Sequence, residues 1–215
     1  MISKILLLIL CLALYGPCAF PQKAVLSSVQ VLEAINSGAK YASTGILDEE
    51  YKSRCDYNLT EGKWYDYEIP WHTGQIIYAL IESARVTGNQ SYLKTAKKSG
   101  DWWIGLEIKD HSKLNGMLAA KHGDHAGETI VFATISDGTA GIYKLSEATK
   151  DKKYAEVATR AGKWMFKNMY IEKEGLCYDN VDPETEEVMK KSSPFWPDKK
   201  DVGLYDVSNN LKTIP

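Results

Sequence analysis

Beyond its first twenty residues, the sequence has no long apolar run, little cysteine and no excess of charge of either sign. The 215 residues include only 4 cysteines, and the formal net charge is -2. Proteins that bind nucleic acid or anionic membranes usually carry a basic excess, so the composition argues against both partners. The sequence also lacks a Gly-x-Ser-x-Gly segment, and neither Cys55 nor Cys177 has a papain-like context. We therefore do not expect a nucleophilic hydrolase of those kinds.

The only apolar run lies at the N-terminus. Lys4 precedes an apolar stretch from Ile5 to Tyr15, and small residues follow near Cys18 and Ala19. This order is typical of a cleaved secretory signal peptide, and the stretch is too short to cross a bilayer. We expect residues 1–19 to be the signal peptide and residues 20–215 to form the mature domain. The protein would then be secreted or lysosomal and would have no membrane anchor.

Secretion would leave Cys55 and Cys177 in an oxidising compartment. They could form a disulfide or remain separate buried thiols, and the sequence leaves both alternatives open. Two N-glycosylation sequons, at Asn58 (NLT) and Asn89 (NQS), fit the same compartment. We expect Asn89 to lie in a turn between two helices, where a glycan would project into solvent.

The sequence does contain an internal repeat. Residues 71–105 recur at a constant offset as residues 134–167. The matched pairs are Thr87 with Thr149, Tyr92 with Tyr154, Ala96 with Ala158, Gly100 with Gly162 and Trp102 with Trp164. Each copy predicts a helix, a polar turn and a second helix. Such a hairpin buries its apolar face only against neighbours, so the repeat predicts an all-α array of stacked hairpins.

Apolar residues at helical spacing place the individual helices. The first is expected over about residues 25–42, and Pro70 marks the start of the second. The repeats carry the stripes Ile77, Leu80, Ile81 and Ala84; Tyr92, Leu93, Ala96, Gly100 and Trp103; Ile142, Leu145 and Ala148; and Tyr154, Val157, Ala158, Ala161, Trp164 and Met165. We expect Trp102, Trp103 and Trp164 to belong to the core.

Three stretches lack helical periodicity. Residues 43–70 are expected to form an irregular loop, and residues 107–136 a long polar connector. Asp182 and Pro183 predict the turn of a small β-hairpin near the C-terminus. An odd number of helices does not make whole hairpins. Either another chain supplies the missing partners, or the sequence is an N-terminal portion of a longer product.

Two groups of residues are candidates for sugar binding. Trp64, Tyr67 and Trp71 surround the start of the second helix, next to His72 and Gln75. Flat rings pack against the C–H faces of sugars, and polar groups fix the hydroxyls. Aromatic packing over the rim of the domain is the alternative for each ring.

The second group, His125 and Glu128, lies in the connector segment KHGDHAGE. Imidazole and carboxylate groups can bind metals, but this run lacks both HExxH spacing and cysteine partners. We expect a substrate-binding or solvated loop and no metal.

The segments WHTGQIIYALIESARVTGNQSYLKTAKKSGDWW and DGTAGIYKLSEATKDKKYAEVATRAGKW resemble the six-hairpin glycosidase superfamily. The resemblance covers about Val25 to Trp196. It implies an (α/α)6-barrel type of toroid, all-α and apparently incomplete here, with a small β-hairpin near the C-terminus. The chain looks most like the unsaturated uronyl (glucuronyl or rhamnogalacturonyl) hydrolases. That likeness implies that Asp137, at the start of an inner helix, is the general acid/base.

The sequence departs from that subfamily one hairpin earlier. A second functional Asp is usual there, whereas this chain has His72, Thr73 and Gln75. The segment PWHTGQ is instead similar to the start of an inner helix in the catalytic domain of glucuronyl C5-epimerases. Both resemblances imply a glycan that contains uronic acid.

Asp137 also has a purely structural interpretation. It precedes Gly138 and an apolar-periodic helix, which places it at or near an N-cap. A capping carboxylate stabilises a helix by about 1 kcal/mol. Capping and catalysis therefore both remain open for this residue.

The sequence as a whole predicts a secreted carbohydrate-active hydrolase. It would remove a terminal sugar, unsaturated uronic acid in our interpretation, from an oligosaccharide or polysaccharide by acid–base catalysis without a cofactor. The alternatives are an enzyme like the glucuronyl C5-epimerases and a catalytically inactive glycan-binding scaffold.

Overall fold

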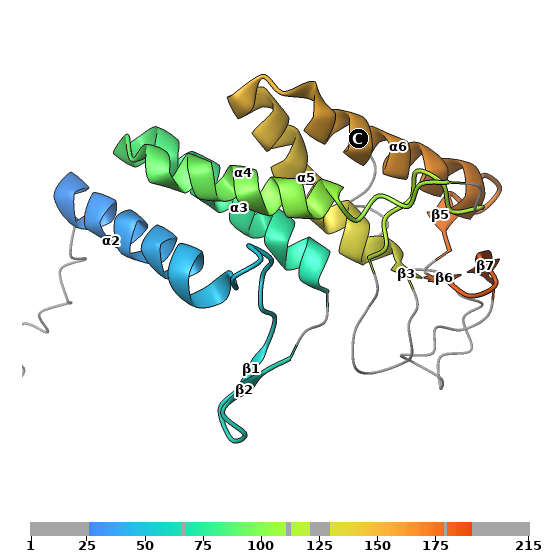
Figure 1. Ribbon diagram of the computed structural model, residues 1–215, viewed down its shortest axis with the longest axis horizontal. Helices are drawn as coiled ribbons and strands as arrows, with labels where there is room; N and C mark the ends of the chain where they lie inside the picture. The colour runs from blue at the N-terminus through green and yellow to red at the C-terminus, as the bar shows by residue number, and fades with distance from the viewer. Residues whose placement is uncertain (1–25, 66–67, 111–112, 121–129, 179, 191–215) are drawn as a thin grey trace, which may run out of the picture. The chain divides into compact units, whose positions relative to one another are not determined.

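The structure is a computed structural model that describes residues 26–65, 68–110, 113–120, 130–178 and 180–190 (Figure 1). The chain divides into two units at Glu33, and helix α2 (Ser28–Tyr41) crosses this boundary. Among the described residues, no helix has both the length and the apolar character needed to cross a membrane.

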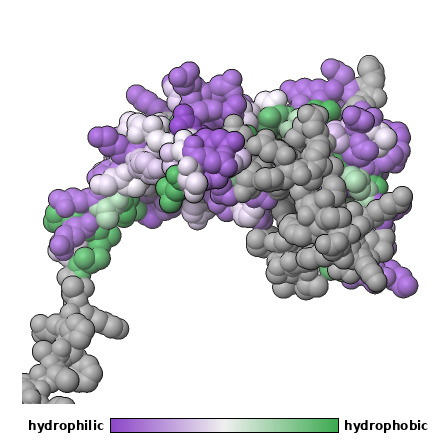
Figure 2. Space-filling view, turned by 90° about the horizontal axis from the view of Figure 1, so that it is seen from below, coloured by the Kyte–Doolittle hydropathy of each residue, from purple (hydrophilic) through white to green (hydrophobic). Residues whose placement is uncertain are grey.

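Helix α2 confirms the first predicted helix, but its apolar stripe is largely exposed. Val29 is 63% exposed and Leu32 38%, and only Ala39 is buried. The apolar end of this helix is drawn in green in Figure 2. A short π-helix, η1 (Ala42–Ile46), follows directly.

Both predicted helical hairpins are present. Helices α3 (Ile69–Thr87) and α4 (Gln90–Ile104) form the first, and α5 (Phe132–Thr149) and α6 (Lys152–Met169) form the second. Helix α3 packs against both α4 and α5, and α5 packs against α6 (Figure 1). The two hairpins therefore stack mainly through their first helices.

The two hairpin turns are built alike. Gly88 (φ 75°) and Lys150 (φ 59°) are both left-handed and end the first helix of each pair. Asn89 and Asp151 then cap the second helix, and each side chain accepts a hydrogen bond from the backbone N–H two residues ahead. The left-handed residue helps to pair the backbone carbonyl groups at the end of one helix. The capping side chain pairs a backbone N–H group at the start of the next helix. Glycine carries no Cβ, which suits Gly88 to this conformation better than Lys150.

Three glycines allow α3 and α5 to meet backbone to backbone. A Cβ added to Gly74 would overlap the backbone of Gly138, and one added to Gly141 would overlap the carbonyl oxygen of Gly74. Gly138 also faces the carbonyl oxygen of Pro70, whereas Gly141 faces the backbone nitrogen of Tyr78. Residue numbers therefore rise in the same direction along both helices, so the two helices are parallel.

Two large aromatic residues fix the hairpins within the core. Trp103 is fully buried, and its Nε1 donates a hydrogen bond of 3.1 Å to the carbonyl oxygen of Pro70. Tyr154 is also fully buried and donates through its hydroxyl to Asp101 Oδ1 at 2.8 Å. Burial, together with this hydrogen bond, raises the pKa of Tyr154 to about 12. The first contact ties α4 to the start of α3, and the second ties α6 to α4.

The expectations for the core need small corrections. Trp103 is buried as predicted, whereas Trp102 and Trp164 are only half-buried and pack against the core. Ala148, which we placed on the stripe, is exposed. It lies in the last turn of α5, where it lines a cavity.

The C-terminal β-hairpin is confirmed and is part of a larger sheet. Strands β6 (Asn180–Asp182) and β7 (Glu187–Met189) are antiparallel, and Asp182 accepts backbone hydrogen bonds within the turn. Strand β3 (Ile130–Val131) adds to β6. A second small pair joins β4 (Tyr170–Ile171) to β5 (Leu176–Cys177).

The two other aperiodic stretches contain more structure than predicted. Residues 43–70 include most of η1 and the antiparallel pair β1 (Tyr57–Asn58) and β2 (Lys63–Trp64). In the connector, Leu114, Met117 and Leu118 are buried in the core. Periodicity did not reveal η1, β1 and β2 because each is only two to five residues long.

Candidate active site

The glycine contact sets the N-terminal ends of α3 and α5 beside each other. Gly138 of α5 lies against the carbonyl oxygen of Pro70 and the indole nitrogen of Trp103. Asp137, the residue before Gly138, is therefore at the same end of the helix pair as Trp71 and His72. This end gathers the predicted acid/base and two of the predicted sugar-binding residues.

The first turn of α3 carries an aromatic stack and a potential ion pair. The rings of Trp71 and His72 are 5.2 Å apart between centroids, with planes 14° apart. His72 Nε2 lies 3.9 Å from Glu68 Oε2, and the two side chains are 30% and 20% exposed. Glu68 precedes the helix in a left-handed conformation, with φ 55°. A partly exposed imidazole beside a carboxylate suits proton transfer.

The N-cap interpretation of Asp137 is wrong. Helix α5 begins at Phe132, so Asp137 lies in its second turn. Phe132 and Ile135 are 3% and 0% exposed, and they extend the apolar stripe one turn upstream. The Asp137 side chain is half-buried. Because Asp137 is inside the helix, the capping alternative no longer accounts for it, and its catalytic role stays a prediction.

The aromatic loop before α3 forms a hairpin of its own. Trp64, on β2, lies 5.1 Å from Tyr57 between ring centroids, and the guanidinium of Arg54 is 5.9 Å from the Trp64 centroid. The backbone nitrogen of Ser53 donates to Thr73 Oγ1 at 2.9 Å, a buried hydrogen bond. This bond anchors the segment before the hairpin to the second turn of α3.

Of the remaining predicted site residues, the structure describes only Gln75. Gln75 is exposed on α3. Tyr67, His125 and Glu128 lie outside the described residues. The described residues contain no group of three or more metal-binding side chains.

The structure holds Cys55 and Cys177 as buried thiols and not as a mutual disulfide. Cys55 follows η1, whereas Cys177 lies on β5, which pairs with β4 at the end of α6. Burial raises the pKa of the Cys177 thiol. A raised pKa leaves less thiolate, so Cys177 is a poor nucleophile.

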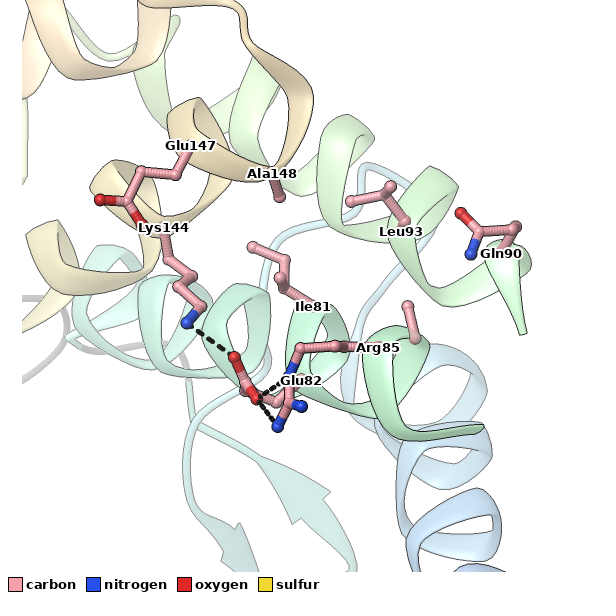
Figure 3. A pocket seen from close by; sticks show the side chains of 9 residues that line it. Ile81, Glu82, Arg85, Gln90, Leu93, Lys144, Glu147 and Ala148 are labelled. Carbon is pink, nitrogen blue, oxygen red and sulfur yellow. Dashed lines mark hydrogen bonds and ion pairs between the residues drawn. The ribbon is translucent and has the colours of Figure 1, made fainter. Parts of the chain in front are cut away.

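A cavity of about 330 Å³ lies at the opposite end of the helix pair (Figure 3). Its lining residues are Ile81, Glu82, Ala84, Arg85, Gln90, Leu93, Lys144, Glu147 and Ala148. Glu82 lies 2.7 Å from both Lys144 Nζ and the Arg85 guanidinium. Hydrogen bonds from Lys144 and Arg85 lower the pKa of Glu82.

The helical periodicity of the sequence did not reveal this cavity, although a signal was present. Glu82 and Lys144 are equivalent positions of the repeat, as Thr87 and Thr149 are. Opposite charges at equivalent positions of stacked hairpins would have predicted a contact between α3 and α5. The cavity is distant from Asp137 along the helices, so it forms a separate region.

Comparison with known proteins identifies the fold. No protein-family model and no curated protein sequence matches the chain. A sugar epimerase from a ruminal bacterium has a TM-score of 0.60 and 12% identity, covering 86% of this chain and 46% of that one. Cellobiose 2-epimerase from Bacillus thermoamylovorans B4167 has a TM-score of 0.58 and 17% identity, covering 74% and 41%.

A glycoside hydrolase has the same arrangement. The GH76 α-mannanase BT2949 from Bacteroides thetaiotaomicron has a TM-score of 0.50 and 16% identity, covering 85% of this chain and 57% of that one. The chain has the six-hairpin glycosidase fold. It spans between 41% and 57% of the length of these three structures. At such low identity the likeness establishes the fold alone.

Proposed function

We propose that the chain belongs to a carbohydrate-active enzyme that acts by acid–base catalysis, with Asp137 as the proton-transfer group. The observation that carries this proposal is the glycine contact between α3 and α5. It places Asp137 at the same end of the helix pair as the Trp71–His72 stack. A carboxyl group and an aromatic surface at one end of a helix pair would combine proton transfer with sugar binding.

Our first candidate is a secreted hydrolase that removes a terminal, unsaturated uronic-acid sugar. The Asp137 carboxyl would protonate the substrate's vinyl ether, or the leaving oxygen of an ordinary glycoside, and water would add to the resulting cation. Partial burial of Asp137 supports this role, because a half-buried carboxyl remains within reach of a substrate. Trp64, Trp71 and Gln75 would contact the sugar.

A second candidate is a sugar epimerase or isomerase, which a different observation favours. His72, on α3, and Glu68, which directly precedes α3, form a second acid/base pair at the same end as Asp137 on α5. Moving a proton off a sugar carbon and returning it at another position or face requires two such groups. Two of the solved structures with this fold are described as epimerases.

Proton NMR in D2O with the full-length protein separates the candidates. A hydrolase converts an unsaturated uronyl disaccharide into two monosaccharides and removes the vinyl signal. An epimerase leaves the glycosidic bond of a saturated disaccharide intact and replaces a ring C–H proton with deuterium. Binding without either reaction would indicate an inactive scaffold, and the absence of both binding and turnover would refute the proposal.

The same assay tests the proposed residue. Asp137→Asn should lower the rate by about 100-fold or more. Glu49→Gln serves as the matched control, because Glu49 is an exposed carboxylate outside the helices. Equal rates for the wild type and Asp137→Asn would remove Asp137 from the mechanism.

A further inference from the structure

Two asparagines occupy the same kind of turn. Asn58, in the β1–β2 hairpin, accepts a hydrogen bond through Oδ1 from the backbone nitrogen of Thr60 at 2.9 Å. Asn89, between α3 and α4, accepts through Oδ1 from the backbone nitrogen of Ser91 at 3.1 Å. In both turns the donor lies two residues ahead and carries a side-chain hydroxyl. This local hydrogen bond from asparagine to the chain defines an Asx turn.

The turns use the side-chain oxygens and leave the nitrogens available. Among the residues that the structure describes, neither Asn58 Nδ2 nor Asn89 Nδ2 donates a hydrogen bond. Asn168 and Asn180 differ: Asn168 Nδ2 donates to the carbonyl oxygen of Trp164 at 2.8 Å, and Asn180 is only 1% exposed. Asn36 and Asn115 are exposed and also show no bond from Nδ2 within the described part of the chain, but neither begins an N-x-S/T sequence. Among the described asparagines, a sequon and an available amide nitrogen therefore occur together at Asn58 and Asn89.

Both turns are also accessible to a large enzyme. Leu59, next to Asn58, is 89% exposed at the end of the β1–β2 hairpin (Figure 1). Asn89 is exposed between the two helices of the first hairpin. Neither residue belongs to the core. An attached glycan would project into solvent without displacing a packed side chain.

We propose that Asn58 and Asn89 are both N-glycosylated, which is independent of the proposed enzyme activity. In the transfer, Nδ2 forms a bond to C1 of the first sugar of a lipid diphosphate-linked oligosaccharide. The bond from C1 to the diphosphate oxygen breaks, the lipid diphosphate leaves, and the amide nitrogen loses one proton. The side-chain oxygen is unchanged, so it continues to accept the backbone hydrogen bond in each turn.

The best test variants remove each sequon but keep the asparagine that forms the turn. Asn89→Gln would remove the cap of α4, and such a loss costs about 1 kcal/mol. Ser91→Ala and Thr60→Ala destroy the sequons but retain the asparagines and the backbone N–H donors. Any change in glycan content of these two variants therefore reports on modification and not on the fold.

The experiment is intact-mass spectrometry of the full chain, expressed with its own N-terminal residues in insect cells. Both the medium and the cell extract are examined, before and after treatment with peptide-N-glycosidase F. We expect two enzyme-sensitive glycans on the wild type, and one each on Thr60→Ala and Ser91→Ala. Ser83→Ala, which changes a helix hydroxyl outside any sequon, should keep both.

Peptide mapping of the wild-type protein gives a second measurement that does not depend on how the variants fold. Deglycosylation in heavy-oxygen water should label Asn58 and Asn89 as newly formed aspartates. A polypeptide of unmodified mass in both medium and extract would overturn the proposal. An unlabelled Asn58 or Asn89 would overturn it for that site.

Discussion

The two ends of the α3–α5 pair are held together by opposite means. At the N-terminal end, backbone meets backbone, because Gly74, Gly138 and Gly141 carry no side chains. At the C-terminal end, Glu82 and Lys144 span the gap between the helices beside a cavity of about 330 Å³. The close contact at the N-terminal end fixes the position of Asp137. The wider separation at the C-terminal end leaves space for the cavity. One pair of helices therefore combines a tightly defined site with an open region.

The largest effect is expected from filling the glycine contact. The side chain in Gly141→Val would occupy the position of the Gly74 carbonyl oxygen, so the helices would have to separate. Overpacking of this kind costs about 3 kcal/mol or more. Urea denaturation should show a much lower free energy of unfolding, or no folded protein.

Gly162→Ala is the matched control for that substitution. Gly162 lies inside α6, and an added Cβ would meet nothing within 4 Å. Replacing a helical glycine with alanine should raise the free energy of unfolding by about 1 kcal/mol. Equal stability of Gly141→Val and the wild type would show that the backbone contact does not hold the helices together.

The next effect concerns chemistry at the glycine end. Asp137→Asn preserves the size of the side chain inside α5 but cannot transfer a proton, so turnover should fall by about 100-fold or more. The melting temperature should change little, because the residue does not cap the helix. A large drop in melting temperature with unchanged turnover would instead assign Asp137 a structural role.

A smaller effect is expected from the aromatic surface at the same end. Trp71→Ala removes the ring that stacks on His72 and should weaken oligosaccharide binding by about 10-fold, the scale of a single aromatic contact. Titration calorimetry on the folded variant gives the affinity. Trp102→Ala, a change at a half-buried tryptophan on α4, is the control. Equal affinity of Trp71→Ala and the wild type would exclude Trp71 from the site.

The smallest effect is expected from the ion pair between Glu82 and Lys144 at the C-terminal end of the helix pair. It is an effect on thermal stability that depends on pH. Hydrogen bonds from Lys144 and Arg85 lower the pKa of Glu82 below its ordinary 4.5. A carboxylate with a lowered folded-state pKa adds stability above its unfolded pKa, and that stability is lost as the pH falls through the folded value. Below pH 4.5 the wild type should therefore lose thermal stability faster than Glu82→Gln.

Salt provides the control for the charged end. At neutral pH, added salt should reduce the difference in thermal stability between the wild type and Glu82→Gln. The Glu82–Lys144 ion pair is partly exposed, so salt screens it. Melting curves across pH and ionic strength measure both effects. Parallel curves for the two proteins would mean that the ion pair does not stabilise the helix pair.

The sequence predicted the features that local patterns determine. The repeat located both hairpins, since Tyr92 and Tyr154 occupy equivalent buried positions. Pro70 located the start of α3, and Asp182 located the C-terminal turn. Each of these signals acts within a few residues of the structure that it specifies.

The errors concern features set by distant parts of the chain. Gly138 suggested a turn before a helix, although it lies within α5, where it accommodates α3. A single sequence does not reveal whether a glycine serves a turn or a close contact. For the same reason it placed Asp137 at a cap. The pairing of β3 with β6 joins segments on either side of a whole hairpin, which periodicity also does not detect.

The glycine contact also determines how rotation would be distributed along the two helices. When two rods touch closely at one point, a small rotation about that point moves each residue in proportion to its distance from it. Glu82 lies eight residues beyond Gly74, about 12 Å along the helix axis, whereas His72 lies only about 3 Å away. A given angular fluctuation should therefore displace the cavity end about four times as far as the end that carries Trp71 and His72.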